Sequence, residues 1–457
     1  MYKILNKKDL FVYPYDMTVP PGKLCLLYSP MTRKAVWLTN ETAKILDDEE
    51  ITDRALQHII NELSDFVPLK NRARKVRNIE DYPLLTVLPN QKCNLNCSYC
   101  YSAKGRSDIE LDIGKLKYAI DFFINSKKQD RPLSISYMGG GEPMLSWNLV
   151  HDSIIYAGQK AKVNAKHIDF TIITNGTLMT DTMLAFIRQN NINISISFDI
   201  LEEIQNKQRG QYQTIINNIQ KLISHHIIPQ INATITPDNV ERMLEMYHQL
   251  DEKFPEITNM MFEPVTAADL FPKSTDLSRF LKIYTDNFLA IDREVHVKGK
   301  SLTSFPYLRT VYPTERACAG EFCLTANGKL SGCYCISTSN DTAYHKVIYG
   351  EVFANTVTGN HKIAVDREIF RNLLDENVYS KEKCKDCTVK WNCGGGCFYL
   401  YNAYPEEYRD VFCDFTKDFV QKIILKRFER LYEKRFGVSP IENISRIRSD
   451  YTILNVK

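Results

Sequence analysis

The stretch that decides the fold reads Leu84-Leu-Thr-Val-Leu-Pro-Asn-Gln-Lys-Cys93-Asn-Leu-Asn-Cys97-Ser-Tyr-Cys100-Tyr101. Its first residues predict a buried strand, and three cysteines follow at the spacing Cys-x3-Cys-x2-Cys. Three thiolates so spaced can hold three irons of a 4Fe–4S cube and leave the fourth iron without a protein ligand. An open iron can bind a substrate directly, as open positions do in other catalytic metal sites. The alternatives are half a zinc site or simple core thiols.

The region around this stretch alternates short β-rich runs with helical patterns such as 181–189 and 214–223. This rhythm predicts βαβ units, a parallel sheet and an α/β fold. Six units indicate a partial (β/α)6 TIM-like barrel over residues 84–300, with its chemistry at the carboxyl ends of the strands. The six predicted strands are Leu84–Leu88, Leu133–Met138, Asp169–Thr174, Asn193–Phe198, Gln230–Ile235 and Met260–Val265.

Polar and glycine-rich motifs follow these strands. Gly140-Gly141-Glu142-Pro143 comes after the second, where glycines let a ligand approach the backbone and the carboxylate can accept from an ammonium. Asn175 ends the third strand, where it can also serve a helix cap and turn. Ser197 and Asp199 end the fourth, and Arg209 follows; a solvated surface role for this arginine is the alternative.

The cysteine motif resembles the signature of the radical S-adenosylmethionine (SAM) superfamily, and Gly140–Pro143 resembles its GGEP motif. The resemblance implies that the open iron binds SAM, and that cleavage of SAM yields a 5′-deoxyadenosyl radical that abstracts a hydrogen atom. It implies that Cys93, Cys97 and Cys100 hold the cluster. The residue after Asp199 is Ile200, where relatives usually carry glycine. The candidate SAM-binding residues are Tyr99, Gly140, Gly141, Glu142, Pro143, Asn175, Ser197 and Arg209.

The remaining clustered cysteines lie in an irregular, glycine-containing region, residues 301–457. Their string is too long and too ordered for one zinc ion, and it resembles the SPASM domain with two auxiliary 4Fe–4S clusters. The resemblance assigns Cys318, Cys333 and Cys397 to the first auxiliary cluster, with Cys323, Cys335 or no protein ligand at its fourth iron. It assigns Cys384, Cys387, Cys393 and Cys413 to the second. A helix over about 417–436 is predicted near the end.

Residues 1–83 predict a separate module. Short strand-like runs at 23–28 and 34–38 flank a turn, and helical patterns follow at 41–48 and 53–64, with Asn40 and Thr52 as expected N-caps. Two strands followed by two helices predict a winged-helix-like unit, and a structural extension of the barrel is the alternative. By its shape the unit resembles the leader-recognition domain of peptide maturation enzymes.

The composition excludes several functional classes. The chain has 457 residues, 13 cysteines and a net charge of +3 from 58 basic and 55 acidic residues, so nothing indicates nucleic-acid binding. Neither a signal peptide nor a transmembrane stretch is visible, which predicts a cytoplasmic protein without membrane contact. Clustered cysteines in such a chain usually ligate metals or clusters.

These features together predict a radical SAM oxidoreductase that forms a thioether or C–C cross-link in a ribosomally made precursor peptide. Its expected partners are that peptide and a low-potential electron donor such as flavodoxin or ferredoxin. An anaerobic sulfatase-maturating enzyme is the alternative within the family. Those relatives carry an aspartate directly after the cysteine corresponding to Cys333, where this chain has Tyr334. A zinc-stapled binding protein without catalysis is the alternative from another class.

Overall fold

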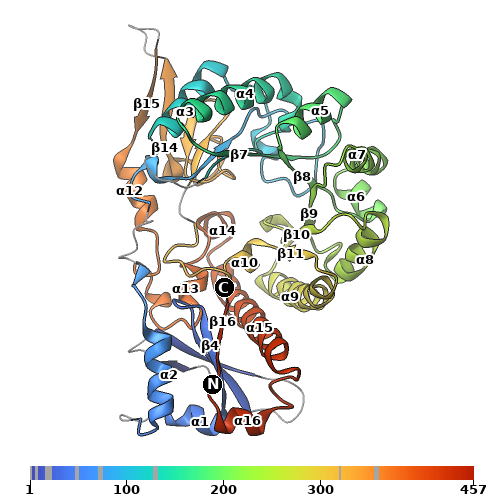
Figure 1. Cartoon of the computed structure of the whole chain (residues 1–457). Coiled ribbons are helices and arrows are strands. Elements are labelled where there is room, and N and C mark those ends of the chain that lie inside the picture. Colours follow the sequence, from blue (N-terminus) through green and yellow to red (C-terminus); the bar gives the residue numbers. More distant parts are fainter. Residues whose placement is uncertain are drawn as a thin grey trace.

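A computed structural model of the chain describes residues 3–5, 9–15, 23–46, 51–69, 76–126, 132–318, 321–354 and 360–456. Figure 1 shows an open, curved α/β body above a smaller β-rich module, with a long helix running between them. None of the helices in these ranges is long and apolar enough to span a membrane.

The curved body is built on one sheet, in the order β11-β10-β9-β8-β7-β6-β5-β12-β13-β14-β15. The six predicted strands are confirmed within one residue at each end, and each pairs in parallel with the next. A seventh parallel strand, β11 (Ser301–Thr303), extends the sheet beyond them. The six are β5 (Leu84–Val87), β6 (Leu133–Tyr137), β7 (Ile168–Thr174), β8 (Asn193–Ser197), β9 (Gln230–Ile235) and β10 (Asn259–Pro264).

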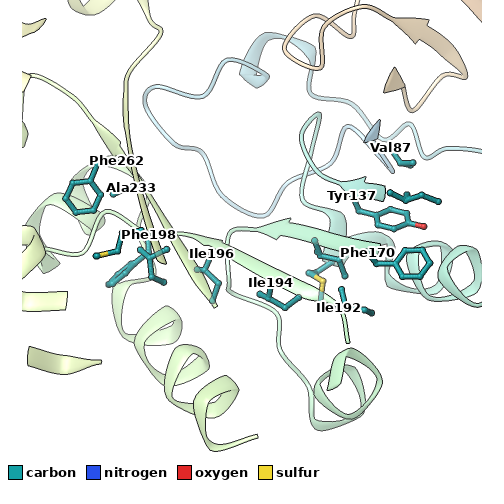
Figure 2. Close-up of a cluster of buried hydrophobic side chains, with 14 of the residues drawn as sticks. Val87, Tyr137, Phe170, Ile192, Ile194, Ile196, Phe198, Ala233 and Phe262 are labelled. Atoms are coloured by element: carbon teal, nitrogen blue, oxygen red, sulfur yellow. The ribbon is translucent and has the colours of Figure 1, made fainter. Parts of the chain in front are cut away.

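Helices cover one face of this sheet, as βαβ connections require. They are α3 (Ile113–Ser126), α4 (Trp147–Val163), α5 (Asp181–Gln189), α6 (Glu202–Gln208), α7 (Tyr212–Ser224), α8 (Met243–Lys253) and α9 (Ser274–Val297). Strand side chains on that face are apolar and buried, as Figure 2 shows for Phe170, Ile194 and Ile196.

The opposite face of the strands is polar. In β9 buried and half-buried residues alternate strictly, so Asn232 and Thr234 lie on the face away from the helices. The register places Ser197 of β8 beside Asn232, and Thr234 beside Glu263 of β10. The concave side of the barrel is therefore lined with hydrogen-bonding groups, and its carboxyl rim carries the predicted motifs.

Beyond β5 the sheet continues into the cysteine-rich region. Strand β12 (Phe322–Leu324) pairs in parallel with β5, and β13 (Lys329–Ser331), β14 (Ile348–Ala354) and β15 (His361–Val365) follow antiparallel. Phe322 packs against Phe122 and Phe123 of α3, so the two regions share one core. Cys318 precedes β12, Cys323 lies in it, and Cys333 and Cys335 follow β13. The remaining cysteines lie in or near the short helices α13 (Lys390–Cys393) and α14 (Phe398–Ala403) and at the start of α15 (Tyr408–Phe436).

The smaller module contains a five-stranded sheet in the order β1-β2-β3-β4-β16. Both predicted strands are present, as β3 (Leu24–Ser29) and β4 (Lys34–Thr39), and β1 (Lys3–Leu5) and β2 (Leu10–Pro14) precede them. The fifth strand, β16 (Ile453–Asn455), comes from the other end of the chain and pairs antiparallel with β4.

Helices pack on both sides of this module. Helix α2 (Arg54–Ser64) packs on one face of the sheet, and helix α15 (Tyr408–Phe436) packs on the other. Helix α15 begins earlier than the predicted helix, which was expected to start at about residue 417. A short helix, α16 (Ile444–Ser449), lies near β4. A winged-helix fold stays a prediction.

Both expected N-caps were wrong by one residue. Helix α1 (Asn40–Ile45) is capped by Thr39, because β4 runs through Thr39 and its hydroxyl accepts from the Thr42 amide. Helix α2 is capped by the carboxylate of Asp53, which accepts from the amides of Ala55 and Leu56. The predicted end of the first helix, at residue 48, lies outside the described residues.

Candidate functional site

The loop that carries Cys93, Cys97 and Cys100 lies at the carboxyl end of β5 and is tied down at both ends. Asn175 Nδ2, at the end of β7, lies 3.8 Å from Cys93 Sγ and donates to Asn94 Oδ1 at 2.9 Å. Arg106 Nη2 lies 3.3 Å from Cys100 Sγ. The sequence predicted a role for Asn175 but not for Arg106, which belongs to no recognised motif.

The middle of the loop is fixed to the rim of β8 and β9. Tyr99 Oη donates to Asp199 Oδ2 at 2.7 Å and accepts from Arg209 Nη1 at 2.9 Å. Asp199 is fully buried and also accepts from the Thr234 amide. The predicted residues Tyr99 and Arg209 thus come together in one chain of hydrogen bonds that ends on a buried carboxylate.

Burial and a nearby positive charge act in opposite directions on the thiols of this loop. Burial raises the pKa of the Cys97 thiol, and the guanidinium of Arg209 opposes that rise. Burial alone would lower the pKa of Arg209, but its neighbours Tyr99 and Cys97 raise it, so the guanidinium stays charged. A fixed cation beside the thiols stabilises thiolates, the form of cysteine that binds iron.

Glu142 is buried, and protein donors already occupy its carboxylate. Oε1 accepts from the Met144 amide at 3.0 Å and from Thr174 Oγ1 at 2.5 Å, and Oε2 accepts from the Asn175 amide at 2.7 Å. Burial raises the pKa of this carboxyl, while the bonds from Thr174 and Asn175 lower it. Glu142 therefore joins the loops after β6 and β7, whatever ligand also reaches it.

The glycines before Glu142 allow this loop to touch the cysteine loop. A Cβ on Gly141 would lie 1.9 Å from the carbonyl oxygen of Lys92, and one on Gly140 would lie 2.7 Å from that of Asn90. Gly140 also has a φ of +66°, which favours glycine. The Glu142 amide donates to Lys92 O at 2.6 Å across this contact. Pro143 follows as the first residue of a 3-10 turn.

Unpaired polar atoms surround the rim. Arg106 Nε, Ser195 Oγ and Arg209 Nε are buried and have no hydrogen-bond partner among the described residues. Ser195 belongs to β8, as does the predicted Ser197 at its end. Such atoms fit a site whose polar ligand supplies the missing partners.

Glu263, at the carboxyl end of β10, is a rim residue that the sequence reasoning missed. It accepts from the Phe305 amide at 2.7 Å, and burial raises its pKa to about 8. A signal was available, because this residue is the one carboxylate in an otherwise apolar strand pattern. A carboxyl that is neutral near pH 7 can donate or accept a hydrogen bond on the concave side of the barrel.

The cysteines expected around the first auxiliary cluster lie together. Cys318, Cys333 and Cys397 line a cavity of about 40 Å³, together with Gly332 and Gly396. Cys335 is hydrogen-bonded to Cys333; this bond and burial raise the pKa of the Cys333 thiol, and burial raises that of Cys335. Cys323 is completely buried in the middle of β12.

The cysteines expected around the second auxiliary cluster also lie together. Burial, together with the nearby Cys393, Cys387 and Cys413, raises the pKa of Cys384 to about 11. Cys413 lies on α15, 3.8 Å from Tyr401 Oη. Among the described residues, no three histidine, cysteine or carboxylate side chains stand close enough to hold a single metal ion.

Tyr334, in the cysteine-rich region, contacts the loop that carries Cys93, Cys97 and Cys100. Its ring packs edge-on against Tyr101, with centroids 6.2 Å apart, and Tyr101 directly follows Cys100. Cys335 lies beside Gln91, Ser102 and Gly140 of the barrel rim. The cysteine-rich region therefore meets the barrel beside the predicted SAM loop.

Comparisons with known proteins agree with this geometry. The chain matches the Radical SAM superfamily over residues 87–250. The cysteine-type anaerobic sulfatase-maturating enzyme of Clostridium novyi (strain NT) is 22% identical over 378 residues, covering 74% of this chain and 94% of that enzyme. The radical SAM cyclopropyl synthase TigE of Paramaledivibacter caminithermalis is 19% identical over 388 residues, covering 78% of this chain and 76% of TigE.

A solved structure shares the fold. Native anSMEcpe with bound AdoMet and the Cp18Cys peptide superposes with a TM-score of 0.57 at 18% identity, covering 75% of this chain and 98% of that one. The cysteine loop, the glycine-rich loop and the polar rim occupy the carboxyl ends of the parallel strands, where this fold holds its cofactors. Residues 87–250 therefore form a radical SAM domain, whose cofactors are S-adenosylmethionine and a 4Fe–4S cluster.

Proposed function

We propose that this protein is a radical SAM maturase that forms a thioether or C–C cross-link in a ribosomally made precursor peptide. When bound, SAM and the cluster on Cys93, Cys97 and Cys100 supply the radical that removes a hydrogen atom from the peptide. The carbon left behind must form its new bond with loss of one proton and one electron. Two auxiliary clusters in the cysteine-rich region would accept that electron, and a low-potential donor such as a flavodoxin or ferredoxin would start the next cycle.

The observation that carries the proposal is the contact between Tyr101 and Tyr334. It puts the thiols of Cys333 and Cys335 next to the SAM loop, so a peptide carbon held on the barrel rim would lie between the two cysteine regions. The relatives at 22% and 19% identity are named for modifying enzymes of this superfamily, which supports the class of reaction.

The roles proposed for the chain's own residues follow from their contacts. The glycine loop brings Glu142 and the backbone of Gly140 and Gly141 to the cysteine loop, where they would orient SAM. Arg209 would hold negative charge near Cys97, and Ser197 would face the ligand from β8. The polar concave face would accept the backbone and polar side chains of an extended peptide.

Sulfatase maturation is the second candidate, because the 22% identical relative is named for it. Formylglycine formation needs a base that removes a proton from the substrate side chain. Tyr334 stands where those relatives carry an aspartate, and burial raises the pKa of its phenol well above its usual range. A neutral, buried phenol is a poor base at pH 7, and this favours cross-linking.

One experiment separates the candidates. The reduced, iron-loaded protein is incubated with SAM and either short peptides encoded beside its gene or a sulfatase-motif peptide, and products are read by mass spectrometry. We expect loss of two hydrogens and a new cross-link in a neighbouring peptide, abolished when Cys93, Cys97 and Cys100 are all replaced by alanine. Conversion of the sulfatase peptide to formylglycine, with no cross-link elsewhere, would establish the second candidate instead.

A further inference from the structure

Arg106 is a charged side chain that lies against the cysteine loop and has no role in the proposed function. Its Nη2 lies 3.3 Å from Cys100 Sγ, and its Nη1 donates to the Leu95 carbonyl at 3.4 Å. One guanidinium therefore touches the loop at two places, once between Cys93 and Cys97 and once at the last thiol. Its Nε is buried and has no hydrogen-bond partner in the part of the chain that the structure describes.

The backbone around Arg106 is fixed on both sides. This residue closes the 3-10 turn Ala103–Gly105, and its amide donates to the Ala103 carbonyl at 3.4 Å. The next residue, Ser107, donates through its amide to the Gln91 carbonyl at 3.3 Å and through Oγ to Gln91 Oε1 at 2.6 Å. A short, hydrogen-bonded segment therefore holds the guanidinium against the cysteine loop.

The cysteine-rich region supports the same segment. Asn340 Nδ2 donates to the Lys104 carbonyl at 2.8 Å. A Cβ on Gly105 would lie 2.6 Å from Cγ2 of Thr338, so this glycine already packs against the threonine side chain. Both partners belong to the stretch that follows β13. The position of the guanidinium therefore depends on the contact between the barrel and the cysteine-rich region.

A guanidinium in this place can act on a cluster through its sulfur ligands. Arginine keeps its positive charge at any ordinary pH, and hydrogen bonds to the sulfurs are among the factors that set a cluster's reduction potential. One-electron reduction adds negative charge to the cube and its thiolates. A charged donor at Cys100 Sγ therefore stabilises the reduced form more than the oxidised form, and brings the cluster within reach of a weaker electron donor.

We propose that Arg106 is a positioning residue that raises the reduction potential of the SAM-binding cluster through its contact with Cys100. The step that it assists moves one electron from the low-potential donor into the oxidised cluster, and no bond in the protein forms or breaks. The inference rests on the radical SAM domain and on the ligand role of Cys100, and not on which peptide product is formed. A clamp on the Leu95 carbonyl alone is the competing role, and it would leave the potential unchanged.

Three variants separate the charge from the clamp. Arg106→Gln removes the charge and keeps a side chain that can donate to the Leu95 carbonyl, whereas Arg106→Lys keeps the charge. Arg188→Gln is the matched control, because it removes the same charge at an exposed position of α5. Each iron-loaded protein is assayed for iron and then titrated anaerobically with a reductant, followed by EPR. The reduced signal that changes when SAM is added identifies the SAM-binding cluster.

Arg106→Gln should lower the equilibrium constant for reduction of this cluster by about tenfold, which is a shift of about 59 mV for one electron. The signals that SAM leaves unaltered should keep their potentials. Arg106→Lys should recover most of the shift, and Arg188→Gln should show none. An unchanged potential in Arg106→Gln at full iron content overturns the proposal, and so does a lysine variant whose potential is as low as that of the glutamine variant.

A second measurement decides the matter even if Arg106→Gln fails to keep its iron. Pulsed EPR of the reduced protein, prepared with 15N-labelled arginine, should show a nitrogen coupled to the SAM-binding cluster, and Arg106→Lys should lose that coupling. A coupling that persists unchanged in Arg106→Lys, or that is absent from the unaltered chain, overturns the proposal. None of these measurements needs a peptide, so an enzyme that cross-links no peptide overturns the proposed function and not this inference.

Discussion

Replacement of Gly141 by alanine tests how closely the glycine loop and the cysteine loop must touch. The new Cβ would lie 1.9 Å from Lys92 O, and real Cβ contacts stay beyond 3.0 Å, so the backbones must separate by about 1.1 Å. That shift breaks the two hydrogen bonds that join the loops, from the Glu142 amide to Lys92 O and from Asn90 Nδ2 to Glu142 O. At ~1 kcal/mol each, the loss of unfolding free energy is about 2 kcal/mol.

Gly158→Ala is the matched control, because Gly158 lies in α4 with no atom within 4 Å of its new Cβ. Alanine there should stabilise the helix by ~1 kcal/mol. Anaerobic urea unfolding gives both free energies, and isothermal titration gives the affinity for SAM. Gly141→Ala should lose stability and SAM binding together. Unchanged stability and affinity in Gly141→Ala would refute the claim that the two loops are held by this contact.

Three further changes probe the site. Tyr99→Phe keeps the ring but removes the hydroxyl between Asp199 and Arg209, and should cost ~1–3 kcal/mol in anaerobic urea unfolding; no loss would mean that the buried carboxylate finds another donor. Glu142→Gln should weaken SAM binding by roughly tenfold or more, since a charge-assisted hydrogen bond contributes ~1.5–3 kcal/mol, and unchanged affinity by titration calorimetry would leave Glu142 with loop-joining alone. Glu263 has its pKa raised to about 8 from the usual ~4.3, so the folded state binds more protons in that interval and stability should fall as pH rises from ~4.3 to about 8. Glu263→Gln should flatten that slope, and an identical slope in both proteins would contradict the assignment.

Local sequence patterns were sufficient for the barrel. Each of the six parallel strands is a short β-rich run between helical segments, and this alternation can be read from the local sequence. The predicted cofactor residues Tyr99, Asn175 and Arg209 come together because they end neighbouring strands or follow them, and the carboxyl ends of parallel strands share one rim.

Elements defined by distant partners escaped prediction. Strand β16 has three residues and exists because β4 offers an edge, so no periodicity marks it. The antiparallel strands β12 to β15 were not predicted, because they lie in the cysteine-rich region, where no clear hydrophobic periodicity marks strands. Arg106 was missed because its contact with Cys100 exists only in the folded chain. Glu263 was missed although it is the one carboxylate in its strand, and the fold creates its contact with Phe305.

The sheet that joins β4 to β16 also sets an order of events during synthesis. Strands β1 to β4 leave the ribosome first, whereas β16 emerges only after the barrel and every cysteine group have been made. Until then the β4 edge is an open strand template, a feature that invites pairing with other nascent chains. Closing the sheet is a very long-range contact, and such contacts form slowly. The N-terminal module would therefore be completed last, when the radical SAM domain has already been synthesised.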